Sequence, residues 1–163
     1  MKVLIVEDDL TTGHLMKYVV GRHADFTHAI DGEEAFDAFC DAFEAGAPFD
    51  LVFLDLMLPI VDGQEVLQAI RQFEEQNGII HTEGVPVVVT TALEDNSEVH
   101  QAMAAGALDY LMKPVKTEKL LEIIKRVERH TIGPESLQDT LLSGAAAGRS
   151  SPKIKSKETR DEY

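Results

Sequence analysis

The sequence predicts an α/β protein in which a parallel sheet of five strands is wrapped by helices. Three observations lead to this fold class. Short apolar segments alternate with segments of helical periodicity along the first 130 residues. Right-handed crossovers between parallel strands place helices on both faces of such a sheet, which makes it doubly wound. Reactive side chains also gather where the predicted strands end, which is the functional edge of this architecture.

Five apolar segments predict the strands. They are residues 2–6, 26–30, 50–56, 85–91 and 108–112. The run at 50–56, DLVFLDL, is typical of a strand buried on both faces, although it carries Asp55 near its end. A carboxylate there is costly unless it is paired, bound to a metal or placed at the sheet edge. Val85 and Pro86 suit a strand start, where proline is tolerated.

Five segments between and after the strands predict helices. In the first helix, one face is expected to carry Leu15, Tyr18, Val19 and Arg22. The other helices are expected at 31–46, 63–78, 95–107 and 116–130. Asp31 is the expected N-cap of the second helix, with Glu34 completing a capping box. The expected buried stripe of that helix is Ala35, Phe36, Phe39 and Phe43.

Composition narrows the classes of function. The chain has 163 residues and a formal net charge of −14, and the excess acid falls within residues 1–130. This charge argues against a nucleic-acid-binding surface in that region and permits a divalent cation or a basic partner. A single cysteine, Cys40, excludes an internal disulfide framework. No signal peptide or membrane-spanning run is found, so we expect a cytoplasmic protein.

Reactive side chains follow four of the predicted strands. They are Glu7, Asp8 and Asp9, then Asp55, then Thr90 and Thr91, and finally Lys113. Because the carboxyl ends of parallel strands meet at one edge, these groups are expected to converge. Asp8 and Asp55 would repel each other as neighbours, and Mg²⁺ relieves such repulsion with carboxylate, water and phosphate ligands. The alternative is that the acids after the first strand only cap the following helix, which remains open for Asp9.

The chemistry that this set of groups favours is phosphoryl transfer to a carboxylate. Asp55 would attack phosphorus and form an aspartyl phosphate. The Lys113 ammonium would neutralise Asp55 at rest and bind a phosphoryl oxygen after transfer. Thr91 can donate one hydrogen bond to another phosphoryl oxygen. Each of these residues alone has an ordinary structural explanation. Their occurrence together at one edge of the sheet favours a phosphoryl-transfer site.

With these motifs in place, the sequence resembles the receiver domains of two-component response regulators. The matching stretches are VLIVEDD (3–9), FDLVFLDLMLPIVDG (49–63), VPVVVTTA (85–92) and AGALDYLMKPV (105–115). The resemblance covers residues 1–130 and implies a flavodoxin-like sheet with strand order 2-1-3-4-5. It also implies that Asp55 is the phospho-acceptor. Asp8, Asp55 and the backbone carbonyl of Met57 would then bind Mg²⁺ directly, and Glu7 would bind it through a water molecule.

The resemblance assigns further roles at the same edge. Thr91 matches the switch hydroxyl, Lys113 the phosphoryl-binding lysine and Tyr110 the switch aromatic. Pro114 is expected to follow a cis peptide bond. In this family, the residues two positions after the phospho-acceptor and two after the switch hydroxyl set the lifetime of the phosphoryl group. Here they are Met57 and Leu93, both apolar, and we expect them to hinder an attacking water molecule.

The implied function is a phosphorylation-activated signalling switch. A sensor histidine kinase or phosphotransfer protein would phosphorylate Asp55, and the remodelled surface would bind a downstream protein or a second copy of the chain. No direct contact with nucleic acid or membrane is expected. One alternative is a phosphohydrolase with an aspartyl-phosphate intermediate, although Met57 occupies the position of its usual acid. Another alternative is a phosphate-independent dimerisation scaffold, which the retained acids, threonine and lysine argue against.

Two regions depart from this pattern. Residues 131–163 are expected to form a partly flexible C-terminal extension, because much of the segment is small, polar and basic. That extension is too short for an output domain, so the chain resembles a stand-alone receiver. The segment at 74–84 is longer than the usual connection. It is expected to extend the third helix or to form a surface loop.

Overall fold

The computed structural model describes residues 1–80, 82–92 and 96–131. Five strands alternate with five helices along these residues. The strands are β1 (Lys2–Val6), β2 (Asp25–Ala29), β3 (Leu51–Asp55), β4 (Val87–Thr91) and β5 (Asp109–Met112). The helices are α1 (Leu10–Val20), α2 (Gly32–Glu44), α3 (Gly63–Gln76), α4 (Asn96–Ala104) and α5 (Thr117–Thr131). Of the predicted extension at 131–163, all but Thr131 lies outside the described residues.

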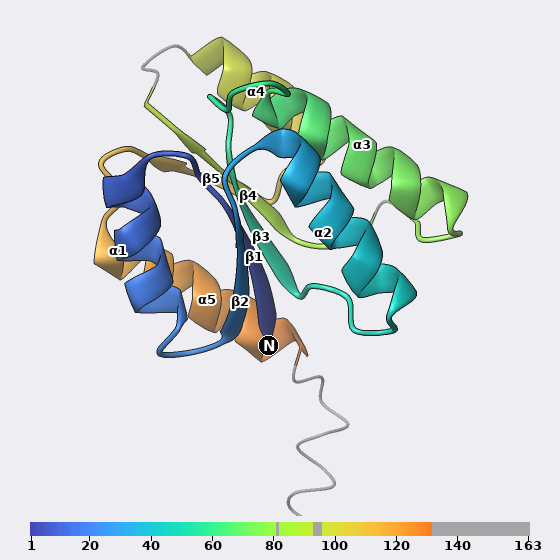
Figure 1. Ribbon diagram of the computed structural model, residues 1–163, viewed down its shortest axis with the longest axis horizontal. Coiled ribbons are helices and arrows are strands. Elements are labelled where there is room, and N and C mark those ends of the chain that lie inside the picture. Colours follow the sequence, from blue (N-terminus) through green and yellow to red (C-terminus); the bar gives the residue numbers. More distant parts are fainter. Residues whose placement is uncertain (81, 93–95, 132–163) are drawn as a thin grey trace, which may run out of the picture. The chain divides into compact units, whose positions relative to one another are not determined.

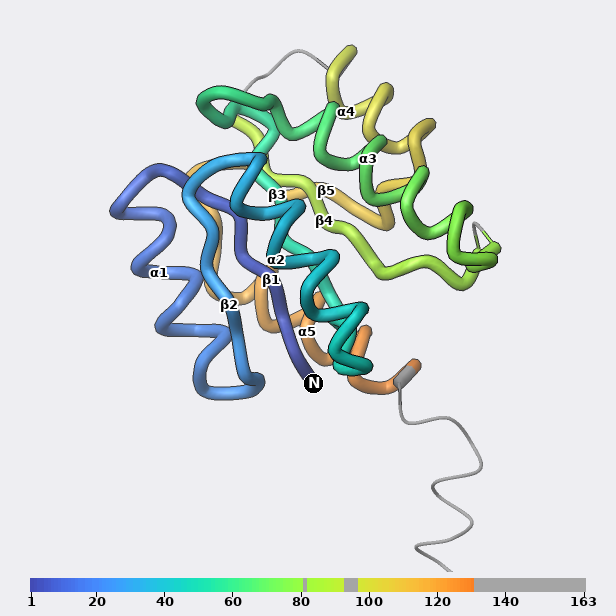
Figure 2. Tube along the Cα trace, turned by 45° about the vertical axis from the view of Figure 1, so that its right-hand side comes forward, coloured from blue at the N-terminus to red at the C-terminus, as the bar shows by residue number. Residues whose placement is uncertain are grey.

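The strands form one parallel sheet in the order β2-β1-β3-β4-β5, which confirms the predicted fold class. Helices α1 and α5 cover one face of the sheet, and α2, α3 and α4 cover the other (Figure 1). A second direction of view shows the same three layers (Figure 2). Reversal of strand order between β1 and β3 creates the crevice at which such folds place their sites.

Each face of the sheet has its own apolar core. Leu4, Val52, Leu54 and Val89 point toward the side of α2 and α3, where they pack with Leu67. Val3, Ile5, Phe53 and Val88 point toward α1 and α5. Alternate residues of the central strands therefore serve opposite cores, which explains why β3 and β4 are apolar almost throughout.

Three of the helices end sooner than predicted, and each ends at a glycine. Gly46, Gly78 and Gly106 follow α2, α3 and α4 with φ angles of 69°, 77° and 94°. A residue with positive φ terminates an α-helix, and glycine adopts this conformation without a steric penalty. The predicted ranges extend to or past these glycines, of which only Gly46, followed by Pro48, is interpreted as a stop signal in the sequence. The physical reason for the difference is thus a cap that periodicity alone does not register.

The residues predicted to share a face of the first helix lie partly at the surface. Val19 is buried, but Tyr18 is 65% exposed and Arg22 stacks on its ring at 5.0 Å. The helix instead buries Gly13, Met16, Val19 and Val20. In α2, Ala35 and Phe39 are buried as predicted, while Phe36 and Phe43 are half-buried and meet the ring of Phe73 edge-on. Aromatic side chains at the border of the core therefore join α2 to α3.

The segment at 74–84 is divided between the two predicted structures. Helix α3 continues to Gln76, and the chain then forms a loop that leads into β4. Asp31 caps α2 as predicted, because its carboxylate accepts a hydrogen bond from the Glu34 amide at 2.8 Å. The Glu34 side chain accepts from the amide of Ile30 at 2.9 Å, one residue before the position that a capping box requires.

Candidate functional site

The predicted site residues lie at the carboxyl edge of the sheet, and strand register explains their proximity. Val6 pairs with Leu54, so Glu7 follows β1 beside Asp55, the last residue of β3. Asp55 pairs with Thr90, and Thr91 pairs with Met112, which directly precedes Lys113. Four strands thus deliver acidic, hydroxyl and ammonium groups to one place, although these residues are far apart in the sequence.

Asp55 is 1% exposed, and both of its carboxylate oxygens have partners. Oδ1 accepts a hydrogen bond from the backbone amide of Met57 at 2.9 Å. Oδ2 accepts one from Nζ of Lys113 at 2.6 Å. These bonds stabilise the ionised carboxylate, because a buried charge needs both an opposite charge and hydrogen bonds.

Gly63 allows the loop after β3 to return close to Asp55. A Cβ atom at position 63 would overlap the backbone carbonyl oxygen of Asp55 and the Cα atom of Leu56. The Gly63 amide donates a hydrogen bond to the Leu56 carbonyl at 3.1 Å, and Asp62 caps the start of α3. The close approach therefore requires glycine and starts α3 directly beside the acidic site.

Lys113 connects two of the acids. Its Nζ atom lies 2.6 Å from Asp55 Oδ2, 2.9 Å from Glu7 Oε2 and 3.0 Å from Glu7 Oε1. Burial alone would lower the pKa of Lys113, but the hydrogen bonds from its ammonium to Asp55 and Glu7 outweigh burial and raise that pKa. The lysine is thus held in its charged form. The Lys113–Pro114 peptide bond is cis, as expected from the sequence.

Glu7 is unusually easy to protonate for a glutamate. Burial raises the pKa of its carboxyl to about 7, against the opposing effect of the Lys113 hydrogen bond, and the nearby charge of Asp55 raises it further. The side chain also accepts the Asp9 amide at 3.0 Å, and the Glu7 carbonyl lies 2.9 Å from Nε2 of His28. Burial, which disfavours the charged carboxylate, therefore outweighs the stabilising contacts that Glu7 makes.

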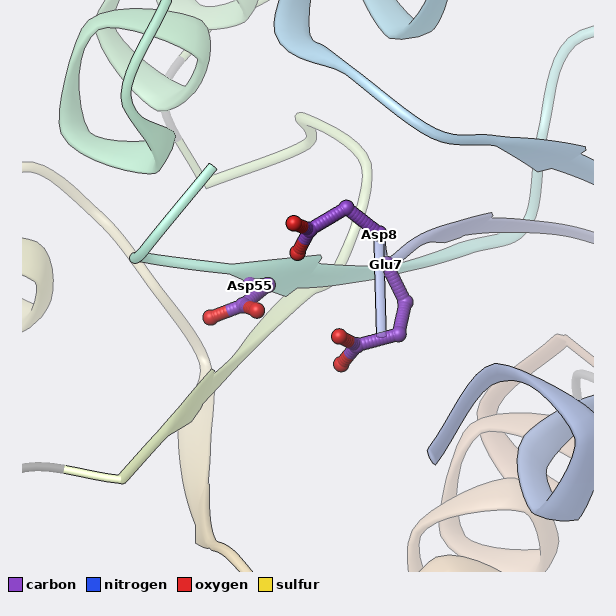
Figure 3. A group of neighbouring side chains, drawn as sticks. All are labelled: Glu7, Asp8 and Asp55. Carbon is purple, nitrogen blue, oxygen red and sulfur yellow. The ribbon is translucent and has the colours of Figure 1, made fainter. Parts of the chain in front are cut away.

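Glu7, Asp8 and Asp55 form a cluster that could hold a metal ion. One oxygen from each carboxylate lies within 4.8 Å of the others. The three carboxylates turn toward a common space, Glu7 and Asp8 from the end of β1 and Asp55 from the end of β3 (Figure 3). Glu7 and Asp55 are buried and Asp8 is exposed, so the cluster opens to solvent on one side. Hard oxygen ligands with room for water suit Mg²⁺.

The acidic triplet after β1 serves two purposes. Asp9 is the N-cap of α1, because its carboxylate accepts the Thr12 amide at 2.7 Å. This hydrogen bond lowers the pKa of Asp9. The alternative interpretation, in which these acids cap the following helix, is therefore correct for Asp9. Glu7 and Asp8 instead face Asp55.

Three further predicted residues lie within the part of the chain that the structure describes. Thr91 is fully buried at the end of β4, and the Lys113 amide donates to its carbonyl at 2.8 Å. Tyr110 on β5 is 44% exposed, and the Met57 side chain is 56% exposed beside Asp55. Leu93, the second predicted lifetime residue, lies outside the described residues. Sequence reasoning missed His28 as a neighbour of Glu7, because only the pairing of β1 with β2 reveals it.

Comparison with known proteins gives one consistent family. Residues 3–125 match the model of the response regulator receiver domain. The chain is 36% identical over 124 residues to the transcriptional regulatory protein CitT of Halalkalibacterium halodurans, covering 73% of this chain and 48% of CitT. It is 29% identical over 126 residues to the osmosensing histidine protein kinase SLN1 of Saccharomyces cerevisiae, covering 76% of this chain and 10% of SLN1. The chain therefore spans about half or less of these curated relatives.

Solved structures agree with the family model. The receiver domain of Ssk1 from Saccharomyces cerevisiae, solved with the histidine phosphotransfer protein Ypd1, is 32% identical with a TM-score of 0.66. This match covers 76% of our chain and 86% of that one. The chemotaxis response regulator CheY4 of Vibrio cholerae is 27% identical with a TM-score of 0.61, covering 77% of this chain and 97% of CheY4. Among the described residues, none of the helices combines the length and apolar character needed to cross a membrane.

Proposed function

Because this chain belongs to the family of response regulator receiver domains, we propose that it is a signalling switch activated by phosphorylation of Asp55. One observation carries the proposal. Asp55 combines a buried carboxylate, a Lys113 ammonium at 2.6 Å and two neighbouring acids, of which Glu7 is buried and Asp8 is exposed to solvent. This arrangement offers a nucleophile, a positive charge for a phosphoryl oxygen and ligands for a divalent cation.

In the proposed reaction, an oxygen of Asp55 attacks the phosphorus of a phosphohistidine. The new oxygen–phosphorus bond forms as the nitrogen–phosphorus bond breaks, and the histidine nitrogen leaves with the bonding electrons. Lys113 then pairs with a phosphoryl oxygen instead of the free carboxylate, and its raised pKa keeps it charged. The Thr91 hydroxyl donates to a second phosphoryl oxygen.

The cofactor of this reaction is Mg²⁺. Asp8, Asp55 and the backbone carbonyl of Met57 would hold the ion directly, and Glu7 would hold it through a water molecule. When bound, the ion neutralises charge on the phosphoryl oxygens and on the acids. Burial is the largest cause of the raised pKa of Glu7, and the nearby charge of Asp55 adds to it; a cation held among these acids would offset that repulsion.

The conformational response would begin at Thr91. Its movement toward the phosphoryl group vacates space that Tyr110, now 44% exposed, can enter. This exchange would change the surface formed by α4, β5 and α5, where partners would bind. Phosphorylation shifts the population because only the active state allows Thr91 to contact the phosphoryl group.

The proposed phosphoryl donor is a sensor histidine kinase or a phosphotransfer protein. Support comes from the Ssk1 receiver, which was solved together with the histidine phosphotransfer protein Ypd1. Residues 1–130 would act as the receiver domain in a cytoplasmic setting, and 131–163 as an extension of it. A downstream protein partner or a second copy of the chain would read the phosphorylated state.

Intact-mass measurement after incubation with Mg²⁺ and acetyl phosphate tests the proposal. We expect one phosphoryl adduct per chain, absent in Asp55→Asn and after removal of Mg²⁺ by EDTA. Asp37→Asn, which removes an exposed carboxylate on α2, is the matched control and should keep the adduct. Persistence of the adduct in Asp55→Asn would overturn the assignment, as would rapid multiple turnover of the phosphodonor, which would indicate a phosphohydrolase.

The same measurement followed over time tests the lifetime assignment. The exposed Met57 side chain and Leu93 are proposed to hinder the water molecule that would hydrolyse the aspartyl phosphate. A double variant with glutamine at both positions should lose its adduct faster than the unaltered chain. An unchanged or slower decay would contradict this role.

A further inference from the structure

A hollow of about 610 Å³ lies at the amino edge of the sheet, opposite the acidic site. Its walls come from α3, the loop before β4, the connection between α4 and β5, and the last turns of α5. The volume falls within the range of small-molecule sites, roughly 300–1,000 Å³. The phosphoryl chemistry does not use this region.

The ionisable side chains that line the hollow are all basic. Arg71, Arg126 and His130 line it, and none of the described lining residues is aspartate or glutamate. The whole chain has a formal net charge of −14, so a wall with basic side chains and no acid is unexpected. The partners of the two arginines, Glu74 at 2.6 Å and Asp109 at 2.8 Å, are not among the lining residues. Each guanidinium group at the hollow is therefore paired with a carboxylate that does not itself line the space.

Two buried donors at the hollow lack an acceptor. Nε of Arg71 and Nε of Arg126 are both buried without a hydrogen-bond partner. The other guanidinium nitrogens of Arg71 are occupied, since Nη1 donates to Glu74, and Nη2 donates to the carbonyls of Val85 and Gly106. A buried N–H group without an acceptor costs roughly 1–3 kcal/mol. Both guanidinium groups therefore have unused hydrogen-bonding capacity beside the hollow.

The rest of the wall is apolar. Val85 and Val127 are buried at its floor, and Leu108 on the rim is 45% exposed. Main-chain groups that a peptide could pair with are already used. The Val85 amide donates to Glu74, the Leu108 amide donates to Val87, and the Val85 carbonyl accepts Arg71. These contacts favour a small molecule over an added peptide strand.

We propose that this hollow binds a small amphiphilic anion, meaning an apolar body that carries one carboxylate, sulfonate or phosphate group. The anionic group lies against Arg71, Arg126 and His130. The apolar body covers Val85, Val127 and Leu108. Because the site does not include Asp55, this binding is independent of the phosphorylation proposed above.

Fluorescence titration of the full chain with 8-anilinonaphthalene-1-sulfonate tests the proposal. We expect saturable binding to one site. Decanoate should displace the probe, whereas inorganic phosphate, which lacks an apolar body, and decanol, which lacks a charge, should displace it poorly. Asp55→Asn should bind the probe as the unaltered chain does, so failure of the phosphorylation proposal would leave this result unchanged.

Two matched pairs of variants locate the site. Arg126→Gln should weaken binding by about tenfold, the loss typical of one charge-assisted hydrogen bond, whereas Arg129→Gln, an exposed cation on the same helix, should not. Leu108→Glu places an acid on the rim and should abolish binding. Met103→Glu, which alters an apolar side chain 40% exposed on α4, should not. All four substituted residues lie at exposed or half-buried positions, so folding should be retained.

Backbone amide chemical shifts provide a second measurement. Probe binding should move the signals of Gly84 and Gly106, which line the hollow, and leave that of Gly63, beside Asp55, unchanged. Absence of saturable binding, equal loss of affinity in Arg126→Gln and Arg129→Gln, or shifts confined to residues outside the hollow would each overturn the proposal.

Discussion

At the scale of single residues, the buried carboxylate of Asp55 is the central feature. It ends a strand whose residues are all buried, yet Lys113 and the Met57 amide satisfy both of its oxygens. Glu7 is in a different position, because it shares Lys113 with Asp55 and its pKa rises to about 7. The protonation of Glu7 is therefore sensitive to pH near neutrality.

Glu7 should make the metal-free protein less stable as pH rises. Its folded pKa, about 7, exceeds the ordinary value of 4.5, so the folded state retains a proton that the unfolded state has lost between these values. The contribution of Glu7 to the free energy of unfolding is therefore largest below about pH 4.5, and it decreases as the pH rises toward 7. His28, Lys113 and Asp55 face the same carboxyl or its backbone. Urea unfolding in EDTA across this range measures the slope.

Glu7→Gln should remove this part of the slope, because the amide does not titrate. Glu44→Gln, an exposed position on α2, is the matched control and should keep the slope of the unaltered protein. Parallel curves for the Glu7 variant and the unaltered chain would show that the Glu7 pKa is not raised.

At the scale of secondary structure, the connection between α3 and β4 depends on a buried ion pair. Arg71 and Glu74 meet at 2.6 Å with side chains 14% and 4% exposed. Glu74 also accepts the Val85 amide at 2.6 Å, and Arg71 donates to the carbonyls of Val85 and Gly106. The pair thus joins α3 to the entry of β4 and to the end of α4. Because Glu74 begins the segment 74–84 and bonds to the Val85 amide that follows it, the pair fixes both ends of this segment.

Removing one partner of this pair should be costly. Arg71→Met leaves Glu74 buried without its cation and should lower the free energy of unfolding by about 3 kcal/mol. Lys119→Met breaks the ion pair with Glu122, whose side chains are 64% and 66% exposed, and should cost less than about 1 kcal/mol. Urea unfolding at pH 7 compares the two variants. Similar losses in both would contradict a structural role for the buried pair.

At the scale of the whole molecule, strand order decides where charge accumulates. The order β2-β1-β3-β4-β5 brings the ends of β1 and β3 together, and with them Glu7, Asp8 and Asp55. The surrounding chain has a formal net charge of −14. A divalent cation at this edge therefore relieves both local repulsion and part of the overall charge.

Mg²⁺ should stabilise the folded chain by binding to it selectively. Above the Kd, each tenfold rise in free Mg²⁺ should add about 1.4 kcal/mol to the free energy of unfolding. Thermal unfolding at constant ionic strength, adjusted with NaCl, separates this effect from general screening of charge. Asp8→Asn should flatten the dependence and Asp37→Asn should retain it. Equal stabilisation of both variants would indicate screening alone.

Much of the fold was predictable because strands and helices are read from local patterns. The alternation of apolar runs with helical periodicity identified all five strands, and Asp31 marked the start of α2. Helix ends were less predictable, since Gly46, Gly78 and Gly106 act through their φ angles. The buried face of α1 was not predicted, and Tyr18 and Arg22 of the predicted shared face stack on each other at the surface.

The sequence by itself determined the residues of the candidate site, since each stands at the end of a recognisable strand. Only the tertiary structure decided which groups meet. It placed Lys113 between Asp55 and Glu7, separated Asp9 as a helix cap, and joined Arg71 and Arg126 around a hollow that no motif marks. The physical reason is that local patterns specify strands and helices, whereas distances between side chains remote in sequence depend on strand order, register and packing.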